Sequence, residues 1–261
     1  MRKRAVTLPG LRQRLRARER LVGTFIKTTH YQVVEIVGSS ALDFMVLDAE
    51  HAPFDRQSLD MAAVAARSAG MPTLVRIPST APKDILDVLD IGFDGIVAPH
   101  AVSRSGVEQT AKACRYADGV RGFSNSPRAG GYGAVGMKQH IERSDSESVL
   151  ICQIEDRSAI EVLHELVAVP DVDGFLIGRA DLALSYGLSD LNHPDVAAAV
   201  ARTIEACVGA GKAVGMFLGS VTDMPAYAQA GASFFIIGSD QSMLRAQAAA
   251  VAAQAAALKT S

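Results

Sequence analysis

The stretch FMVLDA, residues 44–49, is a nearly continuous apolar run that only Asp48 interrupts. Two later stretches, VLICQI at 149–154 and FFIIG at 234–238, have the same character. None of them alternates between polar and apolar residues. Strands that are buried on both faces of a parallel sheet show this pattern. The three runs therefore predict a parallel sheet that is covered on both faces.

Outward from these runs, short β-rich segments alternate with longer helical ones, which is typical of a parallel sheet with crossover helices. Strands are predicted at 22–27, 44–49, 73–77, 95–98, 149–154, 174–177, 213–217 and 234–237. Helices are predicted near 32–39, 57–69, 82–91, 103–115, 157–168, 194–210, 222–230 and 240–258. The 261 residues fit one α/β domain of the (β/α)8 TIM barrel type, which needs about 250. A doubly wound open sheet is the alternative, and it loses support because no GxGxxG follows the first strand.

The segments around the barrel divide the chain further. Residues 1–21 are predicted to form a basic, solvated helical arm, and 22–261 the barrel domain. A long insertion at 117–148 and an irregular stretch at 181–195 interrupt the alternation, as functional loops often do. The last helix, LRAQAAAVAAQAAAL at 244–258, carries so little charge that we expect it to be buried, for example against another subunit.

Composition excludes several classes of function. The net charge of −2 gives no overall attraction for nucleic acid or for an anionic membrane, so neither is expected as a partner. No uncharged stretch reaches the ~18 apolar residues of a membrane span. Three cysteines without a close pair argue against a disulfide framework and favour the cytoplasm. The Arg-rich start leaves organelle targeting, or an arm that contacts nucleic acid, as minor alternatives.

Polar residues gather where the predicted strands end, which is where barrel enzymes carry their chemistry. Glu50, Glu155 and Asp181 follow strands and suit a hard divalent cation. His51 is a candidate base near neutral pH, and Arg76 is a candidate for binding a carboxylate or an enolate. Each carboxylate alone is more often a helix cap or an ion-pair partner, and a lone histidine such as His100 is more often structural; the role of His30 is left open. The set gains weight because all its members follow strands.

Four motifs, LDAEHAP at 47–53, LVRIP at 74–78, QIED at 153–156 and IGRADLA at 177–183, carry a family resemblance. In this order and spacing they resemble the HpcH/HpaI aldolase/citrate lyase family. Within it they resemble the class II, metal-dependent pyruvate aldolases such as 4-hydroxy-2-oxoheptanedioate aldolase. The resemblance runs from about 22 to 244. It implies a barrel whose C-terminal helix is exchanged between subunits, with dimers assembling into a homohexamer.

The resemblance also implies roles for residues that match the family's motifs. Glu155 and Asp181 would hold the divalent cation, which would be Mg²⁺, Mn²⁺ or Co²⁺. Gln153, Ala180, Asp181 and Arg76 would contact the substrate, a 2-oxo acid that chelates the cation through its carboxylate and keto oxygens.

The same resemblance assigns the remaining catalytic roles. His51 would be the base, Asp90 the acid that orients it, and Arg76 the residue that stabilises the enolate. Asp48 and Glu50 would lie near the water shell of the cation. The sequence alone does not show that His51 and Asp90 meet, because Asp90 could equally cap its helix or pair with a surface base.

The predicted reaction is the reversible cleavage of 4-hydroxy-2-oxo acids, through a metal-stabilised enolate, to an aldehyde and pyruvate or a related acid such as hydroxypyruvate. No Schiff-base lysine is needed, and Lys27 is the one candidate for that route. An oxaloacetate decarboxylase, or a citrate-type or acyl-CoA lyase or condensing enzyme of the same superfamily, is the alternative, because it forms the same enolate. A third and weaker interpretation is a catalytically inactive barrel that serves as a binding or scaffold protein. Arg179 stands where relatives often have proline, so the aldehyde side of the site is undetermined.

Overall fold

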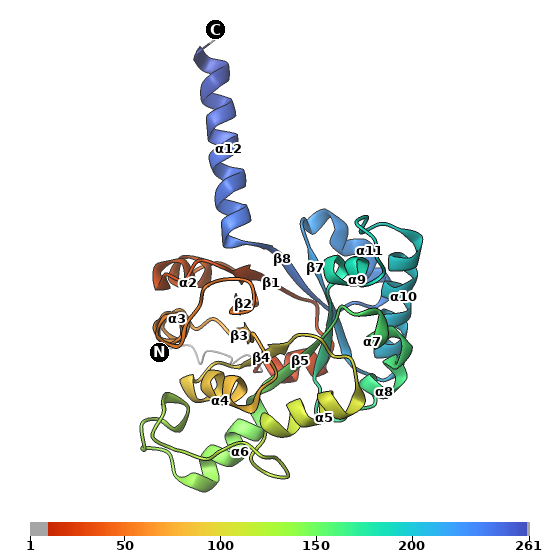
Figure 1. Cartoon of the computed structure of the whole chain (residues 1–261). Coiled ribbons are helices and arrows are strands. Elements are labelled where there is room, and N and C mark those ends of the chain that lie inside the picture. The colour runs from red at the N-terminus through yellow and green to blue at the C-terminus, as the bar shows by residue number, and fades with distance from the viewer. Residues whose placement is uncertain (1–9, 260–261) are drawn as a thin grey trace, which may run out of the picture.

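The computed structural model describes residues 10–259, and within them eight parallel strands close into a barrel (Figure 1). The strands follow one another around the barrel in sequence order, and β8 pairs with β1. The predicted (β/α)8 barrel is therefore confirmed. The strands are β1 (Leu21–Ile26), β2 (Phe44–Asp48), β3 (Thr73–Arg76), β4 (Gly95–Ala98), β5 (Val149–Ile154), β6 (Gly174–Ile177), β7 (Ala213–Leu218) and β8 (Phe234–Ser239).

Helices cover the outside of the barrel, close to the predicted positions. They are α2 (Tyr31–Gly38), α3 (Arg56–Ala69), α4 (Pro82–Ile91), α5 (Arg104–Ala113), α7 (Arg157–Glu161), α8 (Leu163–Val167), α9 (Arg179–Ser185), α10 (Pro194–Gly209) and α11 (Met224–Ala230). The predicted helix at 157–168 is broken into α7 and α8. Glycines end several helices, since Gly70, Gly92 and Gly231 adopt left-handed backbone at helix ends.

The apolar side chains form two cores. One fills the inside of the barrel and includes Phe44, Leu74, Val97 and Phe234 from four different strands. The other lies between the strands and the surrounding helices. Because every strand is covered on both sides, its sequence reads as a continuous apolar run.

The N-terminal helix differs from the predicted solvated arm. In the part of the chain that the structure describes, α1 (Leu11–Arg16) is shorter, and Leu11 and Leu15 belong to the interior core. The buried Arg12 donates from Nε to Asp173, which precedes β6. The helix therefore packs at the amino-terminal end of the barrel. The arm's first nine residues lie outside the described range.

The insertion at 117–148 contains more regular structure than its sequence indicates. A short 3-10 helix, η1 (Arg128–Gly130), precedes α6 (Met137–Glu147), an eleven-residue helix. His140 is the residue of α6 that is buried, so the segment lacks the apolar stripe by which amphipathic helices are recognised. The second irregular stretch also begins inside a helix, because α9 runs to Ser185.

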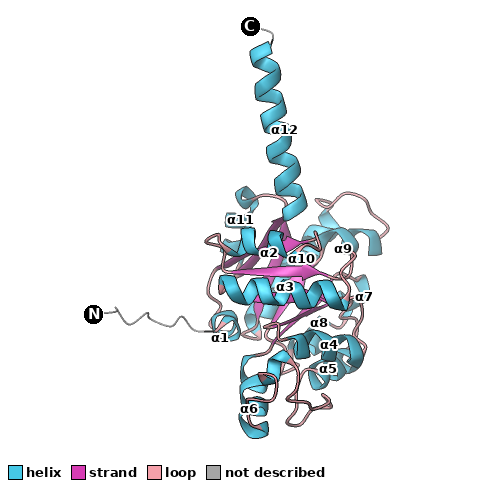
Figure 2. Cartoon of the chain, turned by 90° about the vertical axis from the view of Figure 1, so that its left-hand side faces the viewer, coloured by secondary structure: helices cyan, strands magenta, loops and turns pink. Residues whose placement is uncertain are grey.

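The last helix, α12 (Asp240–Lys259), points away from the barrel (Figures 1 and 2). Asp240 at its start is buried and accepts hydrogen bonds from the backbone N–H groups of Lys27 and Thr28. Apart from the half-buried Ser242, the rest of the helix is exposed in this single chain. Its burial against another subunit stays a prediction.

Among the described residues, no helix has both the length and the hydropathy to cross a membrane.

Candidate active site

The polar residues predicted at the strand ends do meet at one rim of the barrel. The carboxyl ends of parallel strands in a barrel point the same way, so residues that follow different strands become neighbours. A cavity of about 370 Å³ opens there, a volume suited to a small organic acid. It is lined by Phe25, Lys27, His51, Arg76, Gln153, Leu176, Ile177, Gly178, Arg179, Ala180, Asp181, Leu191, Phe217 and Gly219.

Arg76 and Asp48 form a buried pair beneath this cavity. Arg76 donates from Nε to Asp48 Oδ1 at 3.0 Å and from Nη2 to Oδ2 at 2.8 Å, the bidentate geometry that fixes a guanidinium plane. Lys27 Nζ lies 3.0 Å from the same carboxylate, and the guanidinium stacks over the Phe25 ring at 4.7 Å. Burial raises the pKa of Asp48, but the hydrogen bonds and charge of Arg76, with help from Lys27, hold it below its usual value.

Glu155 and Gln153 form a second polar group at the end of β5. Both are 2 % exposed, and the Gln153 amide donates from Nε2 to Glu155 Oε2. Burial raises the pKa of Glu155, and the negative charges of Glu50 and Asp181 act in the same direction. The electrostatics at this end of β5 therefore favour an additional positive charge.

The donor set fits a divalent cation. Gln153 Oε1 and Glu50 Oε2 are buried oxygens without a hydrogen-bond partner among residues 10–259. A cation held by Glu155 and Asp181 would offset the clustered negative charge, and bound waters or substrate would give these oxygens partners. Oxygen-rich donor sets of this kind suit Mg²⁺ and Mn²⁺.

His51 lies at the rim of the cavity, next to the acids of its own motif. Its backbone N–H donates to Asp48 Oδ1 at 3.1 Å, and its Nε2 is 3.8 Å from Glu50 Oε2. The imidazole is about half exposed, so it is open to a substrate.

The structure does not bring Asp90 to His51 within one chain. Asp90 lies in the last turn of α4, and crossover helices run opposite to the strands, so that turn is at the amino-terminal end of the barrel. There Asp90 accepts a hydrogen bond from Arg121 Nη2 at 2.9 Å and borders a cleft of about 550 Å³. The predicted dyad is therefore not intramolecular.

Two arginines of the insertion lie at the same end of the barrel as Asp90. Arg121 is buried and donates hydrogen bonds to Asp90 and to the hydroxyl of Ser144. Arg128 pairs with Asp60 at the edge of the cleft that Asp90 borders.

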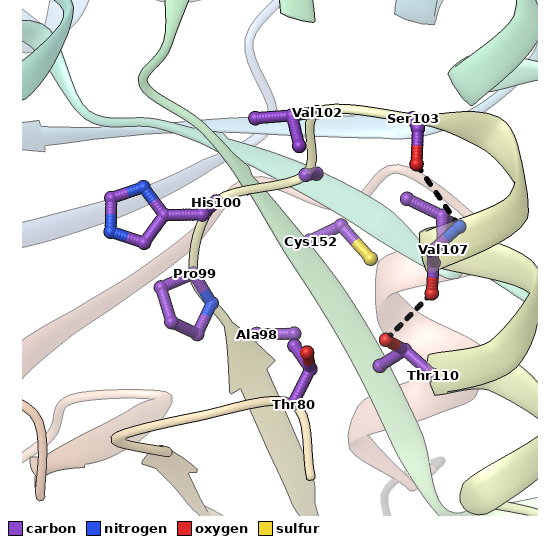
Figure 3. A pocket seen from close by; sticks show the side chains of 11 residues that line it. Thr80, Ala98, Pro99, His100, Val102, Ser103, Val107, Thr110 and Cys152 are labelled. Carbon is purple, nitrogen blue, oxygen red and sulfur yellow. Dashed lines mark hydrogen bonds between the residues drawn. The ribbon is translucent and has the colours of Figure 1, made fainter.

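His100 is a member of the site whose role the sequence left open. Its backbone has a φ of 52°, unusual for a residue with a side chain, and its N–H donates to Glu155 Oε1 at 2.9 Å. Its Nδ1 is 3.0 Å from Asp156 Oδ2, and this hydrogen bond raises the pKa of His100. In Figure 3 the imidazole lies on the opposite side of its loop from Val107 and Thr110 of α5.

Sequence reasoning also missed partners that no motif marks. Phe25 and Phe217 form apolar walls of the cavity. Arg179 donates to the hydroxyl of Tyr227 at 2.9 Å, and Tyr227 lies on α11. For a residue that no motif marks, the one clue in the sequence is a position just after a strand. Asp156, which follows Glu155 at the end of β5, is an example.

Comparisons with known proteins agree with this geometry. Residues 21–246 match the family model described as HpcH/HpaI aldolase/citrate lyase. The 5-keto-4-deoxy-D-glucarate aldolase of Escherichia coli O139:H28 is 30% identical over 88% of this chain and 90% of its own length.

Two solved structures share the fold. One is an HpcH/HpaI aldolase/citrate lyase family protein from Burkholderia cenocepacia J2315, with 30% identity, a TM-score of 0.87 and coverage of 92% of this chain and 97% of the other. The second is the citrate synthase SbnG, with 25% identity, a TM-score of 0.87 and coverage of 97% and 99%. With a closed barrel and the family's motifs at one rim, this chain belongs to the HpcH/HpaI aldolase/citrate lyase family.

Proposed function

We propose that this protein is a metal-dependent aldolase that reversibly cleaves 4-hydroxy-2-oxo acids to an aldehyde and pyruvate or a related 2-oxo acid, such as hydroxypyruvate. The observation that carries the proposal is the buried carboxylate of Glu155 at the end of β5, which accepts a hydrogen bond from Gln153, a residue that lines the same cavity as Arg76. A fixed cation in the wall of a small cavity and a fixed anion next to that wall suit a reaction in which negative charge develops on the substrate.

The side chains of the rim would have different roles in this reaction. His51 would accept the proton of the C4 hydroxyl, after which the C3–C4 bond breaks and its electron pair moves onto the 2-oxo acid fragment as an enolate. Arg76, held in one plane by Asp48, would stabilise the charge of that enolate. Gln153 and Ala180 line the cavity and would position the 2-oxo acid.

A divalent cation, Mg²⁺, Mn²⁺ or Co²⁺, would supply Lewis-acid polarisation of the substrate's carboxylate and keto oxygens when bound by Glu155 and Asp181. Lys27 also lines the cavity, but its ammonium is held by Asp48, and an imine would need the free amine.

A decarboxylase or a condensing enzyme is the second candidate. Oxaloacetate decarboxylation and citrate-type chemistry pass through the same enolate, so the rim would serve them as well. The likeness to the citrate synthase SbnG, which covers nearly the whole chain, favours including this class in any assay.

We also propose a homo-oligomer, with α12 exchanged between copies and dimers assembled into a hexamer. The support is the exposed apolar residues of α12, which a single chain leaves in water. A cytoplasmic location is proposed as well, because Cys114, Cys152 and Cys207 are all free thiols.

A panel assay tests the proposed function. Pyruvate, hydroxypyruvate or oxaloacetate is offered with several aldehydes, with and without Mg²⁺, Mn²⁺ and Co²⁺, after removal of metal by EDTA. We expect no turnover of the metal-free protein and aldol formation when a cation is restored. Borohydride treatment in the presence of pyruvate should leave no adduct. A stable adduct at Lys27, or full activity without metal, would overturn the proposal.

A further inference from the structure

Three side chains next to the proposed cation site form a cluster of their own. His100, Glu155 and Asp156 each offer one ligand atom, and these atoms lie within 4.8 Å of one another. His100 Nδ1 is 3.5 Å from Glu155 Oε1 and 3.0 Å from Asp156 Oδ2. Neighbouring ligands of a six-coordinate cation, with bonds of about 2.1 Å, lie about 3 Å apart. The cluster therefore has the spacing of adjacent ligands around one ion.

The backbone fixes the imidazole in this place. His100 adopts left-handed backbone, which a residue with a side chain occupies at an energetic cost. Its N–H is bonded to Glu155, and the next N–H, of Ala101, donates to the carbonyl of Gln153 at 3.1 Å. The loop after β4 is thus tied to the end of β5. This arrangement presents the imidazole to the carboxylate rather than to solvent alone.

A second observation points to a ligand near Glu155, on the side of its other carboxylate oxygen, Oε2, which accepts a hydrogen bond from Gln153. Gln153 lines the cavity, is 98 % buried, and its Oε1 has no partner among residues 10–259. Two cationic side chains of the cavity wall, Arg76 and Lys27, both bind Asp48. A metal ion held by Glu155 would add positive charge next to this carboxylate, and its bound water would offer the amide oxygen a partner.

We propose that His100 provides a nitrogen ligand to the divalent cation bound at Glu155, and that this ligand makes the site prefer Co²⁺, Ni²⁺ or Zn²⁺ over Mg²⁺. Imidazole suits these borderline cations, whereas Mg²⁺ prefers oxygen ligands. A site of Glu155 and Asp181 alone would offer only oxygen. The inference rests on the proposed function in one respect, because it requires that a cation binds at Glu155.

Direct measurements of cation binding distinguish the His100 inference from the proposed aldolase function. The full-length, metal-free protein is titrated calorimetrically with Co²⁺ and, separately, with Mg²⁺. In H100N, asparagine tolerates the left-handed backbone but removes the imidazole. H30N is the matched control, because His30 is an exposed cap of α2 and asparagine is also a good cap. We expect H100N to weaken Co²⁺ binding by about 10- to 100-fold and Mg²⁺ binding by less than about threefold, with H30N unchanged.

The outcomes are distinct. Equal Co²⁺ affinity in H100N and wild type would overturn the nitrogen ligand and leave the aldolase proposal intact. Failure of the wild-type protein to bind any of these cations would overturn the proposed function itself. If H100N does not fold, pulsed electron paramagnetic resonance of the Cu²⁺-loaded wild type decides the matter. Imidazole nitrogen coupling that persists in H51N supports the inference, and its absence overturns it.

Discussion

The Arg76 guanidinium is at once part of the fold and part of the site. Its side chain is 7% exposed and its pair with Asp48 is buried, so removing it leaves a carboxylate with Lys27 as its remaining ionic partner. The proposed role of Arg76 at the enolate predicts that Arg76→Ala costs far more in turnover than in stability. The bidentate pair adds a stability loss of about 3–5 kcal/mol, typical of a broken buried pair.

The Arg76 prediction is therefore best tested with two variants. Arg76→Ala should lower kcat by about 100-fold or more and also lower the melting temperature. Arg76→Lys keeps a charge without the planar fork, so it should retain most of the stability and recover only part of the turnover. Steady-state kinetics and thermal melts are measured on the same samples. Near-normal kcat in Arg76→Ala would make the residue structural only.

Asp48 makes the stability of the protein depend on pH in a defined direction. Although burial acts to raise it, the pKa of Asp48 is held below its ordinary value of 3.8 by Arg76 and Lys27. Stability from a lowered carboxyl pKa is fully present above the unfolded value and is lost as the pH falls through the folded one. The difference in unfolding free energy between wild type and Asp48→Asn, measured in urea, should thus be constant above about pH 5 and shrink as the pH falls below about 4. A gap that stays constant down to pH 3 would contradict this assignment.

Residues at strand ends could be predicted from the sequence, because position after a strand determines position at the rim. His51, Arg76, Gln153, Glu155 and Asp181 all lie there. His100 was less visible, because its geometry depends on a left-handed backbone that no motif marks. Asp90 was assigned by resemblance alone, and the direction of α4 places it at the other end of the barrel.

At the scale of elements, strand prediction succeeded because both faces of every strand are buried. Each of the eight strands begins and ends within two residues of its predicted bounds. Helices without an apolar stripe were harder, and α6 was missed for that reason. The packing of α1 against the barrel was also missed. The many arginines of this segment indicated a solvated helix, although its Leu11 and Leu15 are buried.

Inside the barrel, one glycine makes space for a ring. A Cβ added at Gly215, on β7, would lie 2.1 Å from Cε2 of Phe234 on β8, so the ring or the strand would have to move. Gly215→Ala should therefore destabilise the fold by about 1–3 kcal/mol, as overpacked cores do. Gly209→Ala is the control, since no described atom comes within 4 Å of its added Cβ. Chemical denaturation measures both. Equal stability of the two variants would show that β7 and β8 can separate without cost.

At the scale of the whole molecule, α12 is the part that one chain leaves incomplete. Leu244, Val251 and Leu258 recur every seven residues, so they lie on one face of the helix, and they are 74%, 55% and 79% exposed. A continuous exposed apolar face of this kind is typical of an interaction surface. We expect light scattering at micromolar concentration to show an oligomer. Val251→Glu should reduce its mass, whereas Ala253→Glu, on the opposite face, should not. A monomeric wild type would refute the assembly.

The position of Asp90 gives the proposed assembly a catalytic consequence. A single chain holds Asp90 and His51 at opposite ends of the barrel, so the predicted dyad can form only between copies. The cleft that Asp90 borders is open, and its carboxylate keeps some exposure beside Arg121. If another copy binds there, each active site takes its base from one chain and its orienting acid from the next.

Mixing two defective variants tests this sharing directly. His51→Ala removes the base and Asp90→Asn removes the acid, so each homo-oligomer should turn over slowly. Refolding them together in equal amounts creates hybrid interfaces in which one site carries both defects and the other carries none. For random pairing, activity should rise to about a quarter of the wild-type value. A mixture no more active than the average of its parents, together with a lowered melting temperature of Asp90→Asn, would leave Asp90 as the structural partner of Arg121 and His51 without an orienting acid.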